Sequence, residues 1–132
     1  MSNPCVAELW QVGDLRSLAL LLADDVTFSS PVADYHGRAD AAHLLTLIPS
    51  VVDDLALGDP ALAGGVRFTS LSASVDGHPL EGLLREREDE QGKLAHVTLF
   101  LRPYHSLKIA IQAMGQRLAE APLPSTRPAD GG

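Results

Sequence analysis

The chain has 132 residues, of which 45% are hydrophobic and 20% charged, as in an average globular protein. This length fits one domain, which we expect at residues 1–120, followed by a disordered, proline-containing tail at residues 121–132. No hydrophobic run is long enough to cross a membrane, and the first residues do not resemble a signal peptide. These features predict a soluble, cytoplasmic protein with no membrane partner.

The formal net charge is −7, and residues 1–101 hold six basic against fifteen acidic residues. Such a body repels phosphate backbones, so we expect no nucleic-acid partner. The single cysteine excludes an internal disulfide and a thiolate-rich metal site. The five histidines have no carboxylates at metal-ligand spacing, so the sequence predicts neither a metal nor a cofactor.

The first half of the chain shows mainly helical periodicity. Cap residues and apolar spacing predict helices at residues 3–13 and 14–23, followed by a strand at residues 26–30. A third helix is expected from about Ala39 to Ile48, where Pro49 ends or kinks it.

The second half has the period of strands. Asp76-Gly77 between two alternating segments is a strong hairpin signal. The expected elements are a short strand at residues 51–57, a loop at 58–65, strands at 67–75, 80–89 and 94–101, and a helix at 105–119.

This order predicts an α+β fold with helices packed on one face of a curved antiparallel sheet. The strand at residues 97–101 is apolar on both faces, so its second face also needs a cover. A homodimer partner would supply that cover, and the C-terminal helix is the alternative.

Several motifs resemble those of nuclear-transport-factor-2-like proteins, in the SnoaL-like branch that includes ketosteroid isomerases and polyketide cyclases. The similar segments are Gly13-Asp14-Leu15, residues 21–28, Ser30-Pro31-Val32, Gly37-Arg38, Gly92-Lys93-Leu94 and Arg102-Pro103. The resemblance implies a cone-shaped, partly mixed sheet around an apolar pocket, commonly in a homodimer.

The catalytic residues of ketosteroid isomerases are not retained at the positions that the resemblance assigns to them. Their tyrosine falls at Val6, their proton-abstracting aspartate at Ser30 and their oxyanion-hole aspartate at Leu84. Leucine has no proton to donate, and serine needs an adjacent base to transfer one at neutral pH. The acid that epoxide hydrolases of this fold carry near the end of the last strand is also missing at Leu101-Arg102.

The resemblance also implies which side chains face the pocket. The residues it directs there from the strands are Phe28, Ser30, Leu84, Glu86, Val97, Leu99 and Leu101, and those it places over the cavity or at its mouth are Trp10, Tyr35 and His36. Trp10 has a core position as its alternative, and the two mouth residues could instead line the exposed start of a helix.

Glu86 is the candidate catalytic residue because an acid in an apolar cavity has its pKa raised into the range of a general acid or base. The alternative is a solvated charge, since residues 85–90 form a run of alternating charges. The sequence therefore predicts a pocket for a hydrophobic small molecule, in an isomerase, cyclase or hydrolase using acid–base chemistry. The alternative is a non-catalytic ligand-binding or dimerisation module of the same fold.

Overall fold

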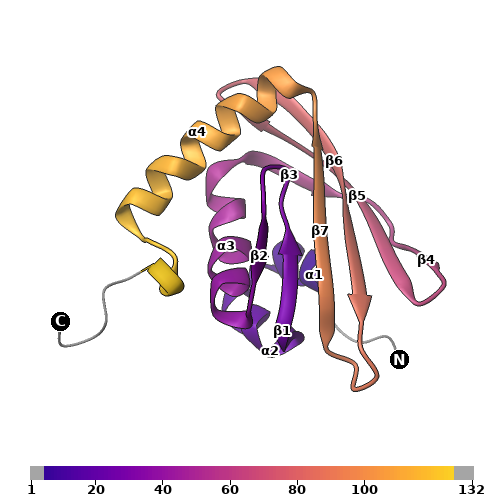
Figure 1. The fold of residues 1–132 in the computed structure, drawn as a ribbon. Helices are drawn as coiled ribbons and strands as arrows, with labels where there is room; N and C mark the ends of the chain where they lie inside the picture. The colour runs from indigo at the N-terminus through magenta and orange to yellow at the C-terminus, as the bar shows by residue number, and fades with distance from the viewer. Residues whose placement is uncertain (1–4, 127–132) are drawn as a thin grey trace.

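The computed structural model describes residues 5–126 as four α-helices, two short 3-10 helices and seven strands (Figure 1). The helices are α1 (Val6–Val12), η1 (Leu15–Ser17), α2 (Leu18–Leu21), α3 (Arg38–Val51), α4 (Tyr104–Glu120) and η2 (Pro124–Thr126). The strands are β1 (Leu22–Ser29), β2 (Asp34–His36), β3 (Asp53–Leu57), β4 (Ala61–Ala63), β5 (Val66–Val75), β6 (His78–Glu88) and β7 (Leu94–Arg102). No described helix is both long and apolar enough to span a membrane.

The strands form one curved sheet in the order β2-β1-β7-β6-β5-β3, with β4 paired to β5. Only the pair of β1 and β7 is parallel among the described strands, and the other pairs are antiparallel. Both α3 and α4 lie on the same side of this sheet, α1 lies behind β1 and β7 in this view, and α2 lies at the lower end of β1 (Figure 1). The predicted α+β fold with a mixed, curved sheet is therefore confirmed.

The hairpin between β5 and β6 is the longest regular pairing in the sheet, and its turn is the predicted one. Val75 pairs with His78, which leaves Asp76 and Gly77 as a two-residue loop. Both loop residues have positive φ angles, 49° and 77°, as a type I′ turn requires. The matched register sets which β6 residues face the helices: Leu84 and Glu86 are buried, whereas Arg87 is exposed.

The third helix runs further than predicted. The sequence places its end at Ile48, but α3 continues through Pro49 to Val51. Proline cannot donate to the Leu45 carbonyl four residues earlier. That carbonyl instead accepts a hydrogen bond from the indole of Trp10, so Pro49 does not leave it without a partner.

The sequence pattern missed two short strands and misplaced the start of others: β3 begins at Asp53 rather than at residue 51, which belongs to α3. A loop is expected at residues 61–63 and no strand is expected at residues 34–36, yet β2 pairs with β1 and β4 pairs with β5. The first strand begins at Leu22, four residues before the predicted start, so the helix before it is shorter. Three-residue edge strands carry no period of their own and depend on partners elsewhere in the chain.

The segment after α4 folds back onto α3. Residues 124–126 form η2, and the Asp40 carboxylate accepts hydrogen bonds from the backbone and hydroxyl of Ser125. This is the first part of the predicted disordered tail, and the remainder of that prediction, residues 127–132, lies outside the described residues. The hydrogen bonds of Ser125 with Asp40 thus hold the segment that follows the C-terminal end of α4 against α3.

Candidate ligand cavity

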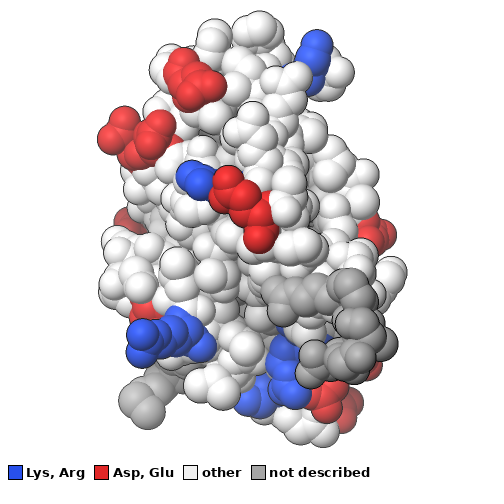
Figure 2. Space-filling model, turned by 90° about the vertical axis from the view of Figure 1, so that its left-hand side faces the viewer, with Lys and Arg blue, Asp and Glu red and all other residues white. Residues whose placement is uncertain are grey.

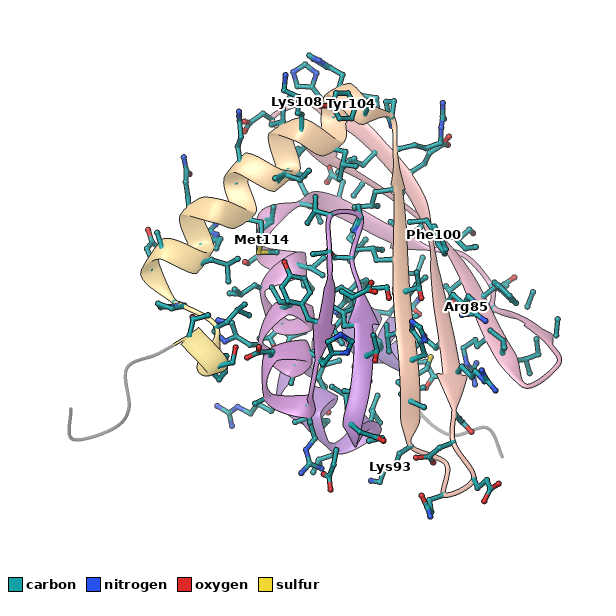
Figure 3. All side chains as sticks on the ribbon, viewed as in Figure 1. Arg85, Lys93, Phe100, Tyr104, Lys108 and Met114 are labelled. Atoms are coloured by element: carbon teal, nitrogen blue, oxygen red, sulfur yellow. The ribbon has the colours of Figure 1, made fainter. Side chains whose placement is uncertain are left out.

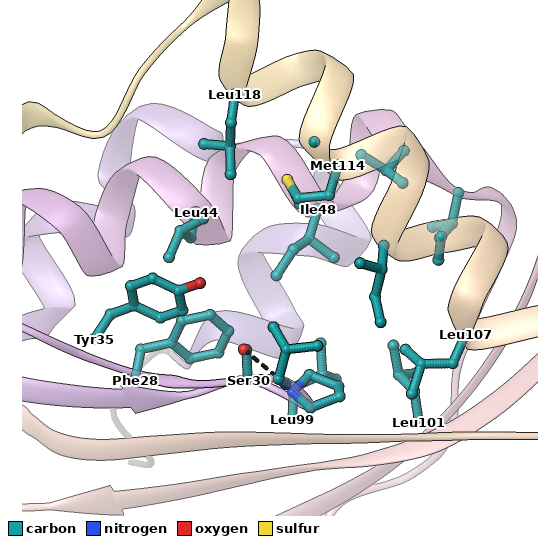
Figure 4. A pocket seen from close by; sticks show the side chains of 17 residues that line it. Phe28, Ser30, Tyr35, Leu44, Ile48, Leu99, Leu101, Leu107, Met114 and Leu118 are labelled. Carbon is teal, nitrogen blue, oxygen red and sulfur yellow. Dashed lines mark hydrogen bonds between the residues drawn. The ribbon is translucent and has the colours of Figure 1, made fainter. Parts of the chain in front are cut away.

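A cavity of about 250 Å³ lies between the concave face of the sheet, α3 and α4 (Figure 4). β1 and β7 line one side of the cavity, α3 lines another side, and α4 covers it. The seventeen lining residues are Phe28, Ser30, Pro31, Val32, Tyr35, Leu44, Ile48, Val51, Val52, Leu99, Leu101, Leu107, Ala110, Ile111, Met114, Gly115 and Leu118. None of them is acidic, basic or a histidine, so the lining has no side-chain charge.

The amphipathic sequence of α4 explains its place over the cavity. Leu107, Ile111, Met114 and Leu118 recur at helical spacing and line the cavity from one face of the helix. The rest of the helix carries exposed polar residues, among them Lys108, Gln112 and Arg117. On the side of the molecule shown in Figure 2, acidic and basic side chains are scattered between uncharged areas rather than gathered by sign. The apolar stripe of α4 thus faces the cavity, although Ile111 is 37% exposed.

Contacts beyond the cavity hold the C-terminal end of α4. His43 Nε2 lies 2.6 Å from the carbonyl oxygen of Ala121, directly after the helix. Asp40, one turn earlier on α3, binds Ser125 at 3.0 Å to the backbone nitrogen and 2.5 Å to the hydroxyl. At its other end α4 follows directly from β7, so the cover is fixed at both ends.

Two lining side chains, Ser30 and Tyr35, carry hydroxyl groups. Ser30 Oγ donates to the Ala33 carbonyl at 3.0 Å and accepts from the backbone N–H groups of Val32 and Ala33. The Tyr35 ring stacks on Phe28 with 6.3 Å between ring centroids. The Tyr35 hydroxyl points toward the cavity in Figure 4 and makes no hydrogen bond with the residues that the structure describes.

Glu86 lies outside this cavity, on the part of β6 that faces α1. Its side chain is only 2% exposed, and Oε1 accepts a 2.6 Å hydrogen bond from the backbone nitrogen of Val6. Oε2 has no hydrogen-bond partner among the described residues. The alternative of a solvated charge is therefore wrong for Glu86, although its neighbour Arg87 is exposed.

Burial dominates the electrostatics of Glu86. Removal from water raises the pKa of the carboxyl above its ordinary value of 4.5, because burial disfavours the charged form. The backbone N–H groups of Val6 and Ala7, and the positive charge of Arg67, partly offset that increase. The lining of the cavity does not include this carboxyl.

The structure brings together five of the nine residues predicted to bind a ligand. Phe28, Ser30, Tyr35, Leu99 and Leu101 all line the cavity. Trp10, Leu84 and Val97 are packed in the hydrophobic core instead, and His36 is exposed, where its Nδ1 lies 3.2 Å from Thr27 Oγ1. The ligand-binding role of each of these residues stays a prediction.

Sequence reasoning missed the lining residues on α3 and α4. Leu44 and Ile48 on α3, and Met114 and Leu118 on α4, line the cavity, and in the sequence they recur at helical spacing. An apolar stripe has the same spacing whether it packs on a core or borders an empty space. Within residues 5–126, no cluster of three or more histidine, cysteine or acidic residues is arranged to hold a metal ion.

Solved structures with a similar fold come from several bacteria. A steroid delta-isomerase from Pseudomonas aeruginosa is 29% identical, with a TM-score of 0.82 and 86% of each chain covered. An uncharacterised protein with a cystatin-like fold from Silicibacter pomeroyi is 23% identical, with a TM-score of 0.81, covering 89% of this chain and 87% of the other.

A third similar structure is an NTF-2-like protein of unknown function from Burkholderia xenovorans, 18% identical with a TM-score of 0.61, covering 78% and 85% of the two chains. No protein-family model matches the sequence, and no curated protein matches it significantly. Together with the mixed curved sheet and the helices on its concave face, these likenesses show that the chain has the nuclear-transport-factor-2-like, or cystatin-like, fold of ketosteroid-isomerase-like proteins.

Proposed function

We propose that the protein binds a small hydrophobic molecule in the cavity between α3, α4 and the sheet. The observation that carries this proposal is the cavity itself, about 250 Å³ in volume and without a charged side chain in its lining. An apolar cavity of roughly 150 Å³ is large enough to hold benzene. The cavity described here therefore suits a ligand somewhat larger than one aromatic ring.

Calorimetric titration with naphthalene tests this proposal, since the probe has two fused rings and no polar group. Gly115 lies on the rim of the cavity, and a Cβ built there meets no atom within 4 Å. Gly115→Leu should therefore fold and extend an apolar side chain over the cavity, weakening naphthalene binding at least tenfold. Gln112→Leu adds the same side chain to α4 at an exposed position outside the lining and is the matched control.

No heat of binding with the unsubstituted protein would overturn the proposal. Equal binding by the wild type and Gly115→Leu would also overturn it, because the probe would then occupy another place. Weakening in both leucine variants would point to a general effect of substitutions on α4 and count against this cavity as the site.

The second candidate function is acid–base catalysis with Glu86, as expected from the resemblance to isomerases and cyclases. Its support is the buried carboxyl with an unpartnered Oε2 and the likeness to a steroid delta-isomerase. The position of Glu86 outside the cavity lining favours the binding function over this one. A steroid isomerase assay tests one such reaction: turnover that disappears in Glu86→Gln would support catalysis, and no turnover would count against steroid isomerisation.

We also propose that the protein forms a homodimer through the convex face of the sheet. Phe100 on β7 is 51% exposed and points away from α3 and α4 (Figure 3). It pairs with Leu83 on β6, beside Ser70 on β5. Since α4 lies on the other face, the C-terminal helix leaves Phe100 uncovered, which favours a second copy of the chain. The cytoplasmic location stays a prediction.

A further inference from the structure

Two of the side chains that line the cavity, Ser30 and Tyr35, carry a hydroxyl group, but only Tyr35 has one that is available to a ligand. A hydroxyl group has one proton to donate and two lone pairs to accept with. Ser30 Oγ uses all three, because it donates to Ala33 and accepts from Val32 and Ala33. Its polar group serves the turn after β1 and has nothing left for a ligand.

Tyr35 differs from Ser30 in this respect. Its hydroxyl has no partner among the described residues, and it is directed from the edge strand β2 toward the cavity (Figure 4). Stacking against Phe28 on the neighbouring strand fixes the plane of the ring. Met114 adds only a thioether, which is a weak acceptor.

The lining also determines the charge of the ligand. An ion that leaves water for an apolar site without a counter-charge pays a large desolvation penalty. No lysine, arginine, histidine, aspartate or glutamate lines the cavity, so neither a carboxylate nor an ammonium group would find a partner there. A neutral ligand loses much less on entering.

We propose that the ligand is a neutral molecule with an apolar body and one carbonyl or hydroxyl oxygen, which binds the Tyr35 hydroxyl. This inference rests on the proposed function, because it assigns the ligand class of the same cavity. The apolar body lies against the leucines of β7 and α4, and the oxygen lies at the β2 end.

Three probes with one ring system test the inference by calorimetry at pH 8: naphthalene, 2-acetylnaphthalene and 2-naphthoate. The ketone should bind about three- to tenfold more tightly than naphthalene, the gain of one hydrogen bond. The carboxylate should bind at least tenfold more weakly than the ketone. Tyr35→Phe should remove the advantage of the ketone over naphthalene.

Tyr104→Phe is the matched control, because this other tyrosine of the chain is 72% exposed at the start of α4 and lies outside the lining. It should keep the full preference for the ketone. Equal affinity for naphthalene and the ketone, or a preference that survives in Tyr35→Phe, would overturn the role of Tyr35 while leaving hydrophobic binding intact. Tight binding of 2-naphthoate would overturn the neutral class, whereas failure of all three probes would overturn the proposed function itself.

Discussion

The indole nitrogen of Trp10 on α1 donates a 2.9 Å hydrogen bond to the carbonyl oxygen of Leu45 on α3. In a regular helix that carbonyl would bond to the N–H of residue 49, but residue 49 is proline. Trp10 and Leu45 are both buried, so water cannot take the place of the missing donor. The contact therefore joins the first helix to the third and compensates for a proline within a helix.

Trp10→Phe should lower the free energy of unfolding by at least about 1–3 kcal/mol, because it leaves the buried Leu45 carbonyl without a partner. Urea unfolding followed by circular dichroism measures the effect. The same substitution is then made in a Pro49→Ala protein, where residue 49 again has an N–H group to donate to the Leu45 carbonyl. Trp10→Phe should lower the free energy of unfolding less in that protein. Equal costs in the two backgrounds would contradict the pairing of Trp10 with the proline position.

Glu86 should make stability depend on pH in a defined direction. Burial raises its pKa in the folded protein above 4.5, so the folded state holds this proton more tightly than the unfolded chain does. The stabilisation from protonation is complete below pH 4.5 and is lost as pH rises through the higher folded-state pKa. Relative to Glu86→Gln, the wild type should therefore become less stable with rising pH.

Unfolding of both proteins in urea at pH 4 to 8 measures this difference. Glu90→Gln, in the exposed turn after β6, is the control and should follow the wild-type profile. A difference between wild type and Glu86→Gln that stays constant across the range would contradict a raised pKa. The Glu86→Gln variant should bind naphthalene with the affinity of the wild type, since Glu86 does not line the cavity.

Cys5 should be unreactive in the folded protein. Burial, with the nearby negative charge of Glu86 as a second cause, raises the pKa of its thiol to about 11. Thiolate is the reactive form, and at pH 8 almost none is present at such a pKa. Labelling with Ellman's reagent at pH 8 should be slow in buffer and fast in 6 M guanidinium chloride. Fast labelling of the folded protein would contradict the packing of Cys5 against the core.

Two glycines should respond to alanine with opposite signs. A Cβ at Gly82 on β6 would collide with the backbone oxygen of Phe100 on β7, which cannot move aside without disturbing the strand pair. Gly82→Ala should therefore destabilise the protein by about 1–3 kcal/mol or more. Gly115 has open space and lies within α4, so Gly115→Ala should stabilise by up to about 1 kcal/mol. Thermal unfolding measures both, and the same sign in both variants would contradict this packing.

The sequence predicted best what depends on neighbouring residues. The Asp76-Gly77 turn and the alternation of apolar and polar residues in β5 predict one long hairpin from neighbouring residues. The apolar stripe of α4 likewise predicts a helix. Other features depend on contacts between distant parts of the chain. The continuation of α3 through Pro49 needs Trp10, thirty-nine positions earlier, and the hydrogen bond of Glu86 joins it to Val6.

Strand parity did not predict that Glu86 and Leu84 lie outside the cavity lining. The resemblance directed Glu86 and Leu84 into it, since both face the helices from β6. The structure shows that the space on this face is divided: α1 packs over these two residues, and the open volume lies under α4. Which part of a concave face is filled depends on the packing of helices, and strand parity alone does not determine it.

The convex face of the sheet provides the last prediction. Phe100 and Leu83 form an apolar pair on that face, flanked by Arg85 and by the exposed ion pair of Arg102 with Glu81. An exposed aromatic residue within a polar border is typical of the centre of an interface. Light scattering should give a particle of twice the 14.0 kDa chain mass.

Phe100→Asp should shift this particle to a monomer, because each copy would bury a charge against the other copy's apolar pair. Tyr104→Asp places the same charge at another exposed aromatic residue, on α4, and should leave the dimer intact. Circular dichroism of both variants separates loss of the interface from loss of the fold. A wild-type monomer at 100 μM, or a folded Phe100→Asp dimer, would show that this face of the sheet stays open to solvent.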